Sequence, residues 1–358
     1  MTQERPLVEC VPNYSEGRDM NVIRQITDAI QSVKGVRLLH VDPGEATHRT
    51  VVTFIGEPEA VVEAAFQGSK KAAEVIDMRI HHGTHPRMGA TDVLPLIPVS
   101  GITLEECAQL ARQLADRLAR EVGIPCYAYE ASAFRPERKN LAVCRAGEYE
   151  ALYEKLTNPD KQPDFMPSLT LNPSPKGEGN LKGEGSGCLL PESVLRAGCT
   201  VVGARDFLIA VNWNLNTTDA SIAQEIACDV REKGRVKPVH VPGTLKCTKA
   251  IGWYIEEYGI AQVSMNMTNI NVTPLHVAYE EVCRCAQNRG VRVTGTEIIG
   301  LVPKRALLEA GRYFLEKEGL LSDGVSEDEL IKKAVKSMGL DDLKPFDPHQ
   351  KVLELVGC

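Results

Sequence analysis

The order of apolar segments constrains the fold of this chain more than any other feature of its sequence. Short apolar runs rich in β-branched residues indicate strands, and longer segments with apolar residues three or four apart indicate amphipathic helices. In the first half they follow in the order strand, helix, strand, strand, helix, strand, over residues 7–11, 19–33, 36–41, 50–55, 58–76 and 93–99. A helix over 103–122 and a strand over 126–129 extend this half.

The same order of six elements recurs in the second half of the chain. The predicted segments cover residues 207–213, 219–232, 250–255, 261–267, 273–288 and 291–298. The two halves share this order but little visible sequence. The order β-α-β-β-α-β is typical of a split βαβ sheet that carries its helices on one face. We therefore predict an α+β protein made of two tandem ferredoxin-like (βαββαβ) subdomains.

The segment between the halves has a different composition. Residues 169–196 contain NPSPKGEGNLKGEGSG, which is rich in Gly, Pro, Ser, Lys and Glu. Such a segment cannot bury enough apolar surface to hold one conformation, so we predict a flexible insertion. A phosphate-binding loop is disfavoured, because its lysine-containing pattern is absent and because Glu178 and Glu184 would repel a phosphate. The two domains then cover residues 1–168 and 197–358, the second with a C-terminal helical tail.

Net charge and cysteine usage narrow the class of protein. The chain of 358 residues carries a formal charge of −7, whereas a surface that binds nucleic acid is normally basic. The N-terminus lacks the layout of a signal peptide, and no window approaches the roughly 20 apolar residues of a membrane helix. The eleven cysteines are scattered, and none forms a C-x-x-C pair. We expect a cytoplasmic protein with reduced thiols that binds neither nucleic acid nor membrane.

The stretch HHGTHPRMGATD, which begins at His81, concentrates candidate functional side chains. Three of the eight histidines of the chain, His81, His82 and His85, lie within five residues. On a helix, the first and last would share a face and could bind zinc. However, Gly83 and Pro86 interrupt the stretch, and the residue before a proline is disfavoured in a helix. We therefore predict no metal at this stretch.

A general base is the second interpretation of the same stretch. Histidine accepts and returns a proton near neutral pH, because its unperturbed pKa is about 6.5. His85 stands before a proline on a stiffened loop, and Arg87 follows two residues later, where its fork of donors would suit a carboxylate. The alternative is that these are solvated loop residues without a catalytic role.

Other polar positions leave two interpretations open. Asp42 ends a predicted strand in a turn-like Asp-Pro-Gly, which turn propensity alone explains. Amide and hydroxyl side chains alternate along two predicted strands of the second half. They are Asn212, Asn214 and Asn216 on one strand, and Gln262, Ser264, Asn266 and Thr268 on the other. Such a face is either a solvent-facing sheet surface or a polar binding face.

Six blocks of the sequence resemble the glutamate formiminotransferase family. They read LVECVPNYSEGRD, VDPGEATHRTVVTFIGEPEAVVEAAF, DMRIHHGTHPRMGATDVLPLIPV, VVGARDFLIAVNWNLNT, KAIGWYIEEYGIAQVSMNMTN and VTGTEIIGLVPKRALLEAGRYF. The resemblance runs from Leu7 to the C-terminus and is interrupted by the glycine-rich insertion. The HPRMGA block and the GWYIEEYGIAQVSMN block are specific in combination.

The resemblance implies a transferase of histidine degradation. Such an enzyme moves the formimino group of N-formimino-L-glutamate to nitrogen 5 of its co-substrate tetrahydrofolate, and leaves L-glutamate and 5-formiminotetrahydrofolate. The fold of the family, two ferredoxin-like subdomains with the folate groove between them, agrees with the element order above. Family members commonly assemble as homodimers, so the implied partners are the two small molecules and a second copy of the chain.

The resemblance also implies roles for individual residues. The catalytic histidine of the family precedes Pro-Arg-Met-Gly, which identifies His85 as the expected general acid and base. Asp42 matches an acidic residue near the family's site, where it would orient His85 or bind the cationic formimino group. Arg87 would hold a substrate carboxylate. One positioned acid–base residue of this kind typically accelerates a reaction about 100- to 10,000-fold.

The folate-contacting segment of the family joins the two halves. The matching residues are Met166, Pro167, Ser168, Ala197 and Gly198. In this chain the insertion separates the two flanks. It would either fold out as a harmless loop, since lengthening a flexible loop adds little closure entropy, or displace the folate wall and weaken activity.

Three other functions compete with formimino transfer. A 5-formyltetrahydrofolate–glutamate formyltransferase of folate salvage would need the same residues, because the two transferred groups differ by one nitrogen. A catalytically impaired folate-binding protein would result if the insertion disturbed the site. A metal hydrolase would need the three clustered histidines as ligands.

Overall fold

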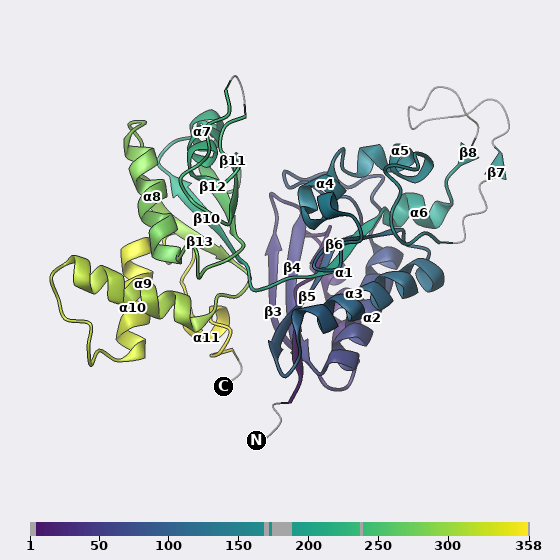
Figure 1. Ribbon diagram of the computed structural model, residues 1–358, viewed down its shortest axis with the longest axis horizontal. Coiled ribbons are helices and arrows are strands. Elements are labelled where there is room, and N and C mark those ends of the chain that lie inside the picture. Colours follow the sequence, from purple (N-terminus) through teal and green to yellow (C-terminus); the bar gives the residue numbers. More distant parts are fainter. Residues whose placement is uncertain (1–4, 168–171, 174–187, 237–238, 357–358) are drawn as a thin grey trace. The chain divides into compact units, whose positions relative to one another are not determined.

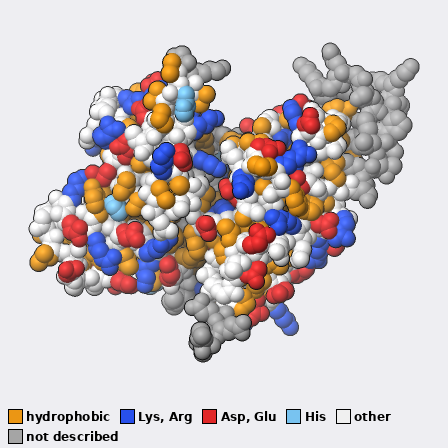
Figure 2. Space-filling view, viewed as in Figure 1, with side chains coloured by type: hydrophobic (Ala, Val, Ile, Leu, Met, Phe, Trp, Pro, Cys, Tyr) orange, Lys and Arg blue, Asp and Glu red, His pale blue; other side chains and the backbone are white. Residues whose placement is uncertain are grey.

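The computed structural model describes residues 5–167, 172–173, 188–236 and 239–356. The chain forms two compact units, Met1–Arg205 and Asp206–Cys358, each with its own sheet, helices and hydrophobic core (Figure 1). The predicted α+β class is confirmed. Basic and acidic side chains are interspersed over the face of the molecule drawn in Figure 2.

The N-terminal unit is built on a seven-stranded sheet. Its strands are β1 (Leu7–Cys10), β2 (Asn13–Tyr14), β3 (Val36–Gly44), β4 (Arg49–Gly56), β5 (Thr91–Ser100), β6 (Cys126–Glu130) and β9 (Thr200–Ala204). Both β1 and β2 pair with β4 and with β5, so together they act as one interrupted strand. The strands follow in the order β3, β4, β1 with β2, β5, β9 and β6. The pairs β5–β9 and β9–β6 are parallel, and the others are antiparallel.

Three longer helices pack against this sheet. They are α1 (Met20–Gln31), α2 (Pro58–Val75) and α3 (Leu104–Arg117), which continues as one π-helical turn to Val122. Their starts follow from local chemistry. The Asp19 carboxylate accepts the first N–H groups of α1, Pro58 occupies the first turn of α2, and Thr103 forms a capping box with Glu106 at α3. The apolar stripes of α1 and α2 enter the core of this unit.

Smaller helices complete the N-terminal unit. They are α4 (Leu141–Arg145), α5 (Leu152–Thr157), α6 (Glu192–Ala197) and two 3-10 turns, η2 (Pro136–Lys139) and η3 (Tyr149–Ala151). The short strands β7 (Asn172–Pro173) and β8 (Cys188–Leu189) pair with each other. Residues 168–171 and 174–187, where most of the predicted flexible insertion falls, lie outside the described residues.

The N-terminal unit differs from the sequence-based prediction in three places. Strand β3 continues through Asp42 to Gly44, so the chain turns at residues 45–48 and not at Asp-Pro-Gly. Strand β9, which was not predicted, lies between β5 and β6 and carries residues 200–204 into the first unit. The last residues of the predicted insertion are ordered and form helix α6. Val194 of this helix and Leu190 just before it are buried in the core.

The C-terminal unit contains the six elements predicted for the second half. They are β10 (Ile209–Leu215), α7 (Ala220–Val230), β11 (Thr248–Ile255), β12 (Ile260–Met267), α8 (Leu275–Gln287) and β13 (Val293–Ile299). The four strands form an antiparallel sheet in the order β11, β12, β10, β13. Helices α9 (Lys304–Lys317), α10 (Glu327–Met338) and α11 (Pro348–Lys351) follow. Of the helices that the structure describes, none combines the length and apolar character needed to cross a membrane.

Removing the glycine-rich part of the insertion is expected to leave the fold intact. In the variant, residues 174–187 are replaced by Asn-Gly, which joins Pro173 to Cys188. These two residues already pair across β7 and β8, so a two-residue turn suits them, and a shorter loop costs less closure entropy. We expect the melting temperature to stay within about 4 °C of the parent protein by calorimetry. A larger fall would show that the deleted residues stabilise the N-terminal unit.

Candidate active site

The loop that carries His85 is seated on the turn between β3 and β4. Thr84 donates from its backbone N–H and its hydroxyl to the Ala46 carbonyl, at 3.3 and 3.1 Å. A side chain at Gly83 would overlap the Thr47 carbonyl oxygen, so only glycine lets the two segments approach this closely. The turn joins β3, which contains Asp42, to β4. Because the loop rests on this turn, the sheet sets the position of the loop.

His81 and His48 fix the start of the loop. Their rings stack with centroids 4.3 Å apart, and His81 Nε2 donates to the His48 carbonyl at 2.8 Å. Burial lowers the pKa of His81 and brings the pKa of His48 to about 4, so both rings are neutral at pH 7. His82 is exposed. Among the described residues, no group of three or more His, Cys, Asp and Glu side chains could hold a metal ion.

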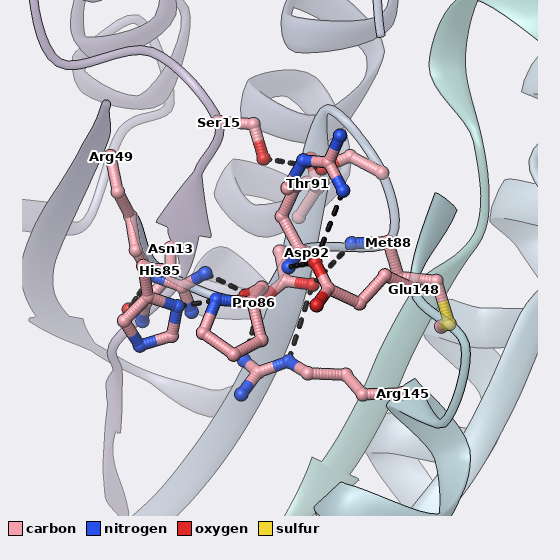
Figure 3. Close-up of polar contacts among 12 residues, drawn as sticks. Asn13, Ser15, Arg49, His85, Pro86, Met88, Thr91, Asp92, Arg145 and Glu148 are labelled. Carbon is pink, nitrogen blue, oxygen red and sulfur yellow. Dashed lines mark hydrogen bonds and ion pairs between the residues drawn. The ribbon is translucent and has the colours of Figure 1, made fainter. Parts of the chain in front are cut away.

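A buried ion cluster lies beside the loop and is drawn in Figure 3. Asp92, at the start of β5, is fully buried and accepts from Arg49 Nη1 at 2.6 Å and from Arg145 Nη2 at 2.5 Å. The Met88 backbone N–H donates to its second oxygen at 2.9 Å, and Arg49 Nε donates to the side-chain oxygen Oδ1 of Asn13 at 2.9 Å. Burial alone would raise the pKa of Asp92, but the two guanidinium groups lower it to about 2.

His85 lies in Figure 3 beside this cluster, and its side chain is partly exposed. Its Nδ1 lies 2.7 Å from the Pro86 carbonyl oxygen, which can only accept, so Nδ1 carries the proton and Nε2 carries the lone pair. Burial and the neighbouring guanidinium groups of Arg49 and Arg145 lower the pKa of His85 well below its usual value. At neutral pH the ring is therefore a neutral base with a defined basic nitrogen.

Arg87 is tied to carboxylates of the protein itself. Its guanidinium contacts both oxygens of Glu150 at 2.7 and 2.8 Å and one oxygen of Glu148 at 3.1 Å, and it also donates to the His81 carbonyl. Its side chain is buried. Arg87 was expected to bind a substrate carboxylate, but these contacts favour a role in holding the loop.

Asp42 lies in β3, opposite Val51 of β4, and is half-buried. The turn that follows it carries the loop with His85, so both residues belong to the same part of the N-terminal unit. Its expected role in orienting His85 or binding a cationic group remains a prediction.

The predicted folate residues Ala197 and Gly198 lie directly against the loop. Ala90 N–H donates to the Ala197 carbonyl at 2.8 Å, Cys199 N–H donates to the Met88 carbonyl at 3.1 Å, and Gly198 forms a β-bridge with Gly89. Gly198 has φ +69°, and a Cβ there would overlap the Met88 carbonyl oxygen. Glycine at both 89 and 198 therefore lets the loop and the segment before β9 come this close.

The other predicted folate residues lie on the opposite side of β6. Phe165 pairs with Cys126, and Met166 and Pro167 follow it, partly buried. Cys126 also pairs with Thr200 of β9, so the two flanks of the insertion lie on either side of one strand. Ser168 lies outside the described residues.

Three residues of the amide-rich face of the C-terminal sheet are buried and hydrogen-bonded within the sheet, whereas Asn216 and Asn266 are exposed. Asn212 and Gln262 donate to the same oxygen of Glu297 at 2.9 and 3.3 Å, and Gln262 also donates to Asn214 at 2.8 Å. Asn212, Asn214 and Gln262 are all buried. The interpretation of these three residues as a solvent-facing surface is therefore wrong.

No sequence motif marks Arg49 or Arg145 as a site residue. They lie 43 and 53 residues from Asp92 along the chain, and nothing in their local sequence marks them as partners. Only the pairing of β2 with β4 and β5, and the position of α4, bring them together.

Comparison with known proteins gives two family matches and several relatives. Residues 7–175 match the formiminotransferase domain, N-terminal subdomain, and residues 210–356 match the formiminotransferase domain. A glutamate formimidoyltransferase of Thermoplasma acidophilum is 39% identical over 92% of this chain and 98% of its own length. One of Streptococcus pyogenes serotype M1 is 42% identical over 87% of this chain and 94% of its own length.

Longer relatives also match. The formimidoyltransferase-cyclodeaminase of Sus scrofa is 45% identical over 97% of this chain, and this chain spans 59% of that relative's length. A solved microcompartment protein from Desulfitobacterium hafniense DCB aligns at 9% identity with a TM-score of 0.20, which is too low to bear on the fold.

Replacing Gly198 with Ala is expected to destabilise the N-terminal unit by about 3 kcal/mol. Positive φ costs a non-glycine residue about 1–2 kcal/mol, and the overlap with the Met88 carbonyl adds a packing cost. Gly259→Ala is the matched control, because Gly259 has φ +66° with nothing within 4 Å of its Cβ position, so it should cost only about 1 kcal/mol. Urea unfolding measures both, and equal costs would mean that the close approach to the loop is unimportant.

The pH dependence of the reaction is expected to show the depressed pKa of His85. With the neutral ring as the expected base, kcat/KM should fall only as pH drops through a pKa that lies below the ordinary 6.5. The acid limb of a kcat/KM profile should therefore lie below pH 6.5. A limb at or above that value would contradict the role of His85 as the titrating base.

Proposed function

The chain belongs to the formiminotransferase family, and from this we propose that it transfers the formimino group of N-formimino-L-glutamate to nitrogen 5 of tetrahydrofolate. The products are L-glutamate and 5-formiminotetrahydrofolate. The observation that carries the proposal is the neutral His85 ring, whose basic Nε2 is fixed by the bond of Nδ1 to a carbonyl.

His85 would serve both halves of the reaction. Nitrogen 5 attacks the formimino carbon, a tetrahedral adduct forms, and the proton of nitrogen 5 passes to His85 Nε2. The bond from that carbon to the glutamate nitrogen then breaks, and His85 returns the proton to the departing amine. A neutral imidazole is needed at the start of this sequence, and the depressed pKa supplies it at neutral pH.

The strand order supports a ferredoxin-like fold for both subdomains. In the C-terminal unit the first strand, β10, lies between the third, β12, and the fourth, β13, and the second, β11, is at the edge. In the N-terminal unit the interrupted strand β1–β2 lies between β4 and β5 in the same way, with β3 at the edge. We propose that β6 and β9 extend this core in the first subdomain only.

The folate site of the proposal includes the two flanks of the insertion. Ala197 and Gly198 lie against the loop of His85, and Met166 and Pro167 lie across β6 from them. Ser168 is assigned on the resemblance alone. The proposal further includes assembly as a cytoplasmic homodimer, which sedimentation velocity would test for the purified protein.

A transfer assay with a loop variant tests the function. With formiminoglutamate and tetrahydrofolate, we expect the parent protein to form 5-formiminotetrahydrofolate and His85→Ala to lose about 100- to 10,000-fold in kcat. His82→Ala is the control, because this exposed histidine lies on the same loop and should retain activity.

Two results would contradict the proposal. One is a His85→Ala variant with nearly unchanged kcat, which would remove His85 from the mechanism. The other is a folded parent protein that turns over 5-formyltetrahydrofolate with glutamate but not formiminoglutamate, which would make formyl transfer the reaction.

A further inference from the structure

The ion cluster at Asp92 is not balanced in charge. Two guanidinium groups, those of Arg49 and Arg145, share this one carboxylate. The side chains are 7%, 15% and 0% exposed for Arg49, Arg145 and Asp92, so one positive charge is in excess where little water can solvate it. Within the part of the chain that the structure describes, neither guanidinium forms an ion pair with a second carboxylate.

Other buried arginines of the same unit are fully compensated. Arg138 pairs one to one with Asp164 at 2.6 Å, and Arg87 faces two glutamates. Burying a charge without a partner is costly, so an excess at one position is a feature that requires a compensating anion. Burial, and repulsion by Arg145, lower the pKa of Arg49 to about 10, as expected for a cation short of compensation.

Both guanidinium groups retain donors for a ligand. Within the described residues, the hydrogen bonds of Arg49 use Nη1 and Nε, and those of Arg145 use Nε and Nη2. Arg49 Nη2 and Arg145 Nη1 therefore form none of these hydrogen bonds within the described residues. Asp92 and Asn13 fix the planes of the two groups, which gives a rigid, positively charged site of the kind that binds carboxylates.

The excess charge lies beside the proposed base. Arg49 and Arg145 both act electrostatically on His85, and Figure 3 shows the three residues together around Asp92. A neutral His85 contributes no negative charge, so the anion must come from the substrate. Asp92 cannot supply a second negative charge, because its single charge is already shared by the two arginines.

We propose that Arg49 and Arg145, held by Asp92, bind the α-carboxylate of formiminoglutamate. This inference rests on the proposed function. In formiminoglutamate the α-carboxylate carbon is three bonds from the formimino carbon, so it lies next to the reacting atoms. The carboxylates of folate are separated from nitrogen 5 by the aminobenzoyl group and lie too far away to share a site that adjoins His85.

Arg145→Gln and Arg49→Gln test the subsite by a split between the two Michaelis constants. Loss of one charged hydrogen-bonding partner should raise KM for formiminoglutamate about 10- to 100-fold. The KM for tetrahydrofolate should change less than about threefold on the same scale. A rise in KM for tetrahydrofolate instead would place a folate carboxylate at the cluster and overturn the inference.

Substrate analogues that lack one of the two carboxylates identify which of them the arginines bind. The effect of Arg145→Gln should persist with formiminoglutamine, which keeps the α-carboxylate. It should vanish with N-formimino-4-aminobutyrate, which lacks that group and keeps the other. The reverse pattern would assign the γ-carboxylate and refute the proposal as stated.

Arg138→Gln is the matched control, because it removes another buried arginine of the same unit but leaves Asp164 without an ion-pair partner. We expect it to leave the Michaelis constants unchanged and to lower the melting temperature more than Arg145→Gln does. The latter variant leaves Arg49 and Asp92 as a balanced pair, so it should fold. A larger loss of stability in Arg145→Gln would mean that the cluster is only structural.

Titration calorimetry with L-glutamate separates this inference from the proposed function. The parent protein should bind glutamate and Arg145→Gln should bind it at least 10-fold more weakly. If the parent protein binds glutamate through Arg145 but turns over no formiminoglutamate, the proposed function fails and the subsite stands. If turnover is normal and glutamate binding is unaffected by either substitution, the subsite fails and the function stands.

Discussion

The ion cluster of Asp92 with Arg49 and Arg145 is the interaction on which the candidate site depends. It joins the start of β4, the start of β5 and helix α4, which are far apart in sequence. The Met88 backbone N–H also binds Asp92, so the same carboxylate fixes the loop that carries His85. The fully buried Asp92 carboxylate is stable as an ion only because two cations and an N–H group surround it.

Close approach of backbone segments is the second constraint. Gly83 lets the loop rest on the β3–β4 turn, and Gly89 and Gly198 let it contact the segment before β9. As a result, residues that the insertion separates in sequence meet at β6 and at the loop. The C-terminal flank of the insertion, Ala197 and Gly198, therefore lies against the loop that carries His85.

The sequence predicted the elements better than their connections. All six elements of the second half were found, since each has clear apolar periodicity. Strand β9 was missed because its five residues are buried on both faces and show no alternation. Arg87 was predicted to bind substrate because it stands near His85 in sequence. Only the fold shows that the terminal nitrogens of Arg87 already pair with Glu148 and Glu150.

By itself, the sequence determined the α+β class, the family and the identity of His85 as the candidate base, because these depend on local periodicity and on contiguous motifs. The tertiary structure alone decided the proton position on His85, the structural contacts of Arg87, and the pairing of Arg49 and Arg145 with Asp92. Charge balance at a buried site is a sum over neighbours in space. Strand pairing supplies those neighbours from distant parts of the chain, so no local pattern reveals them.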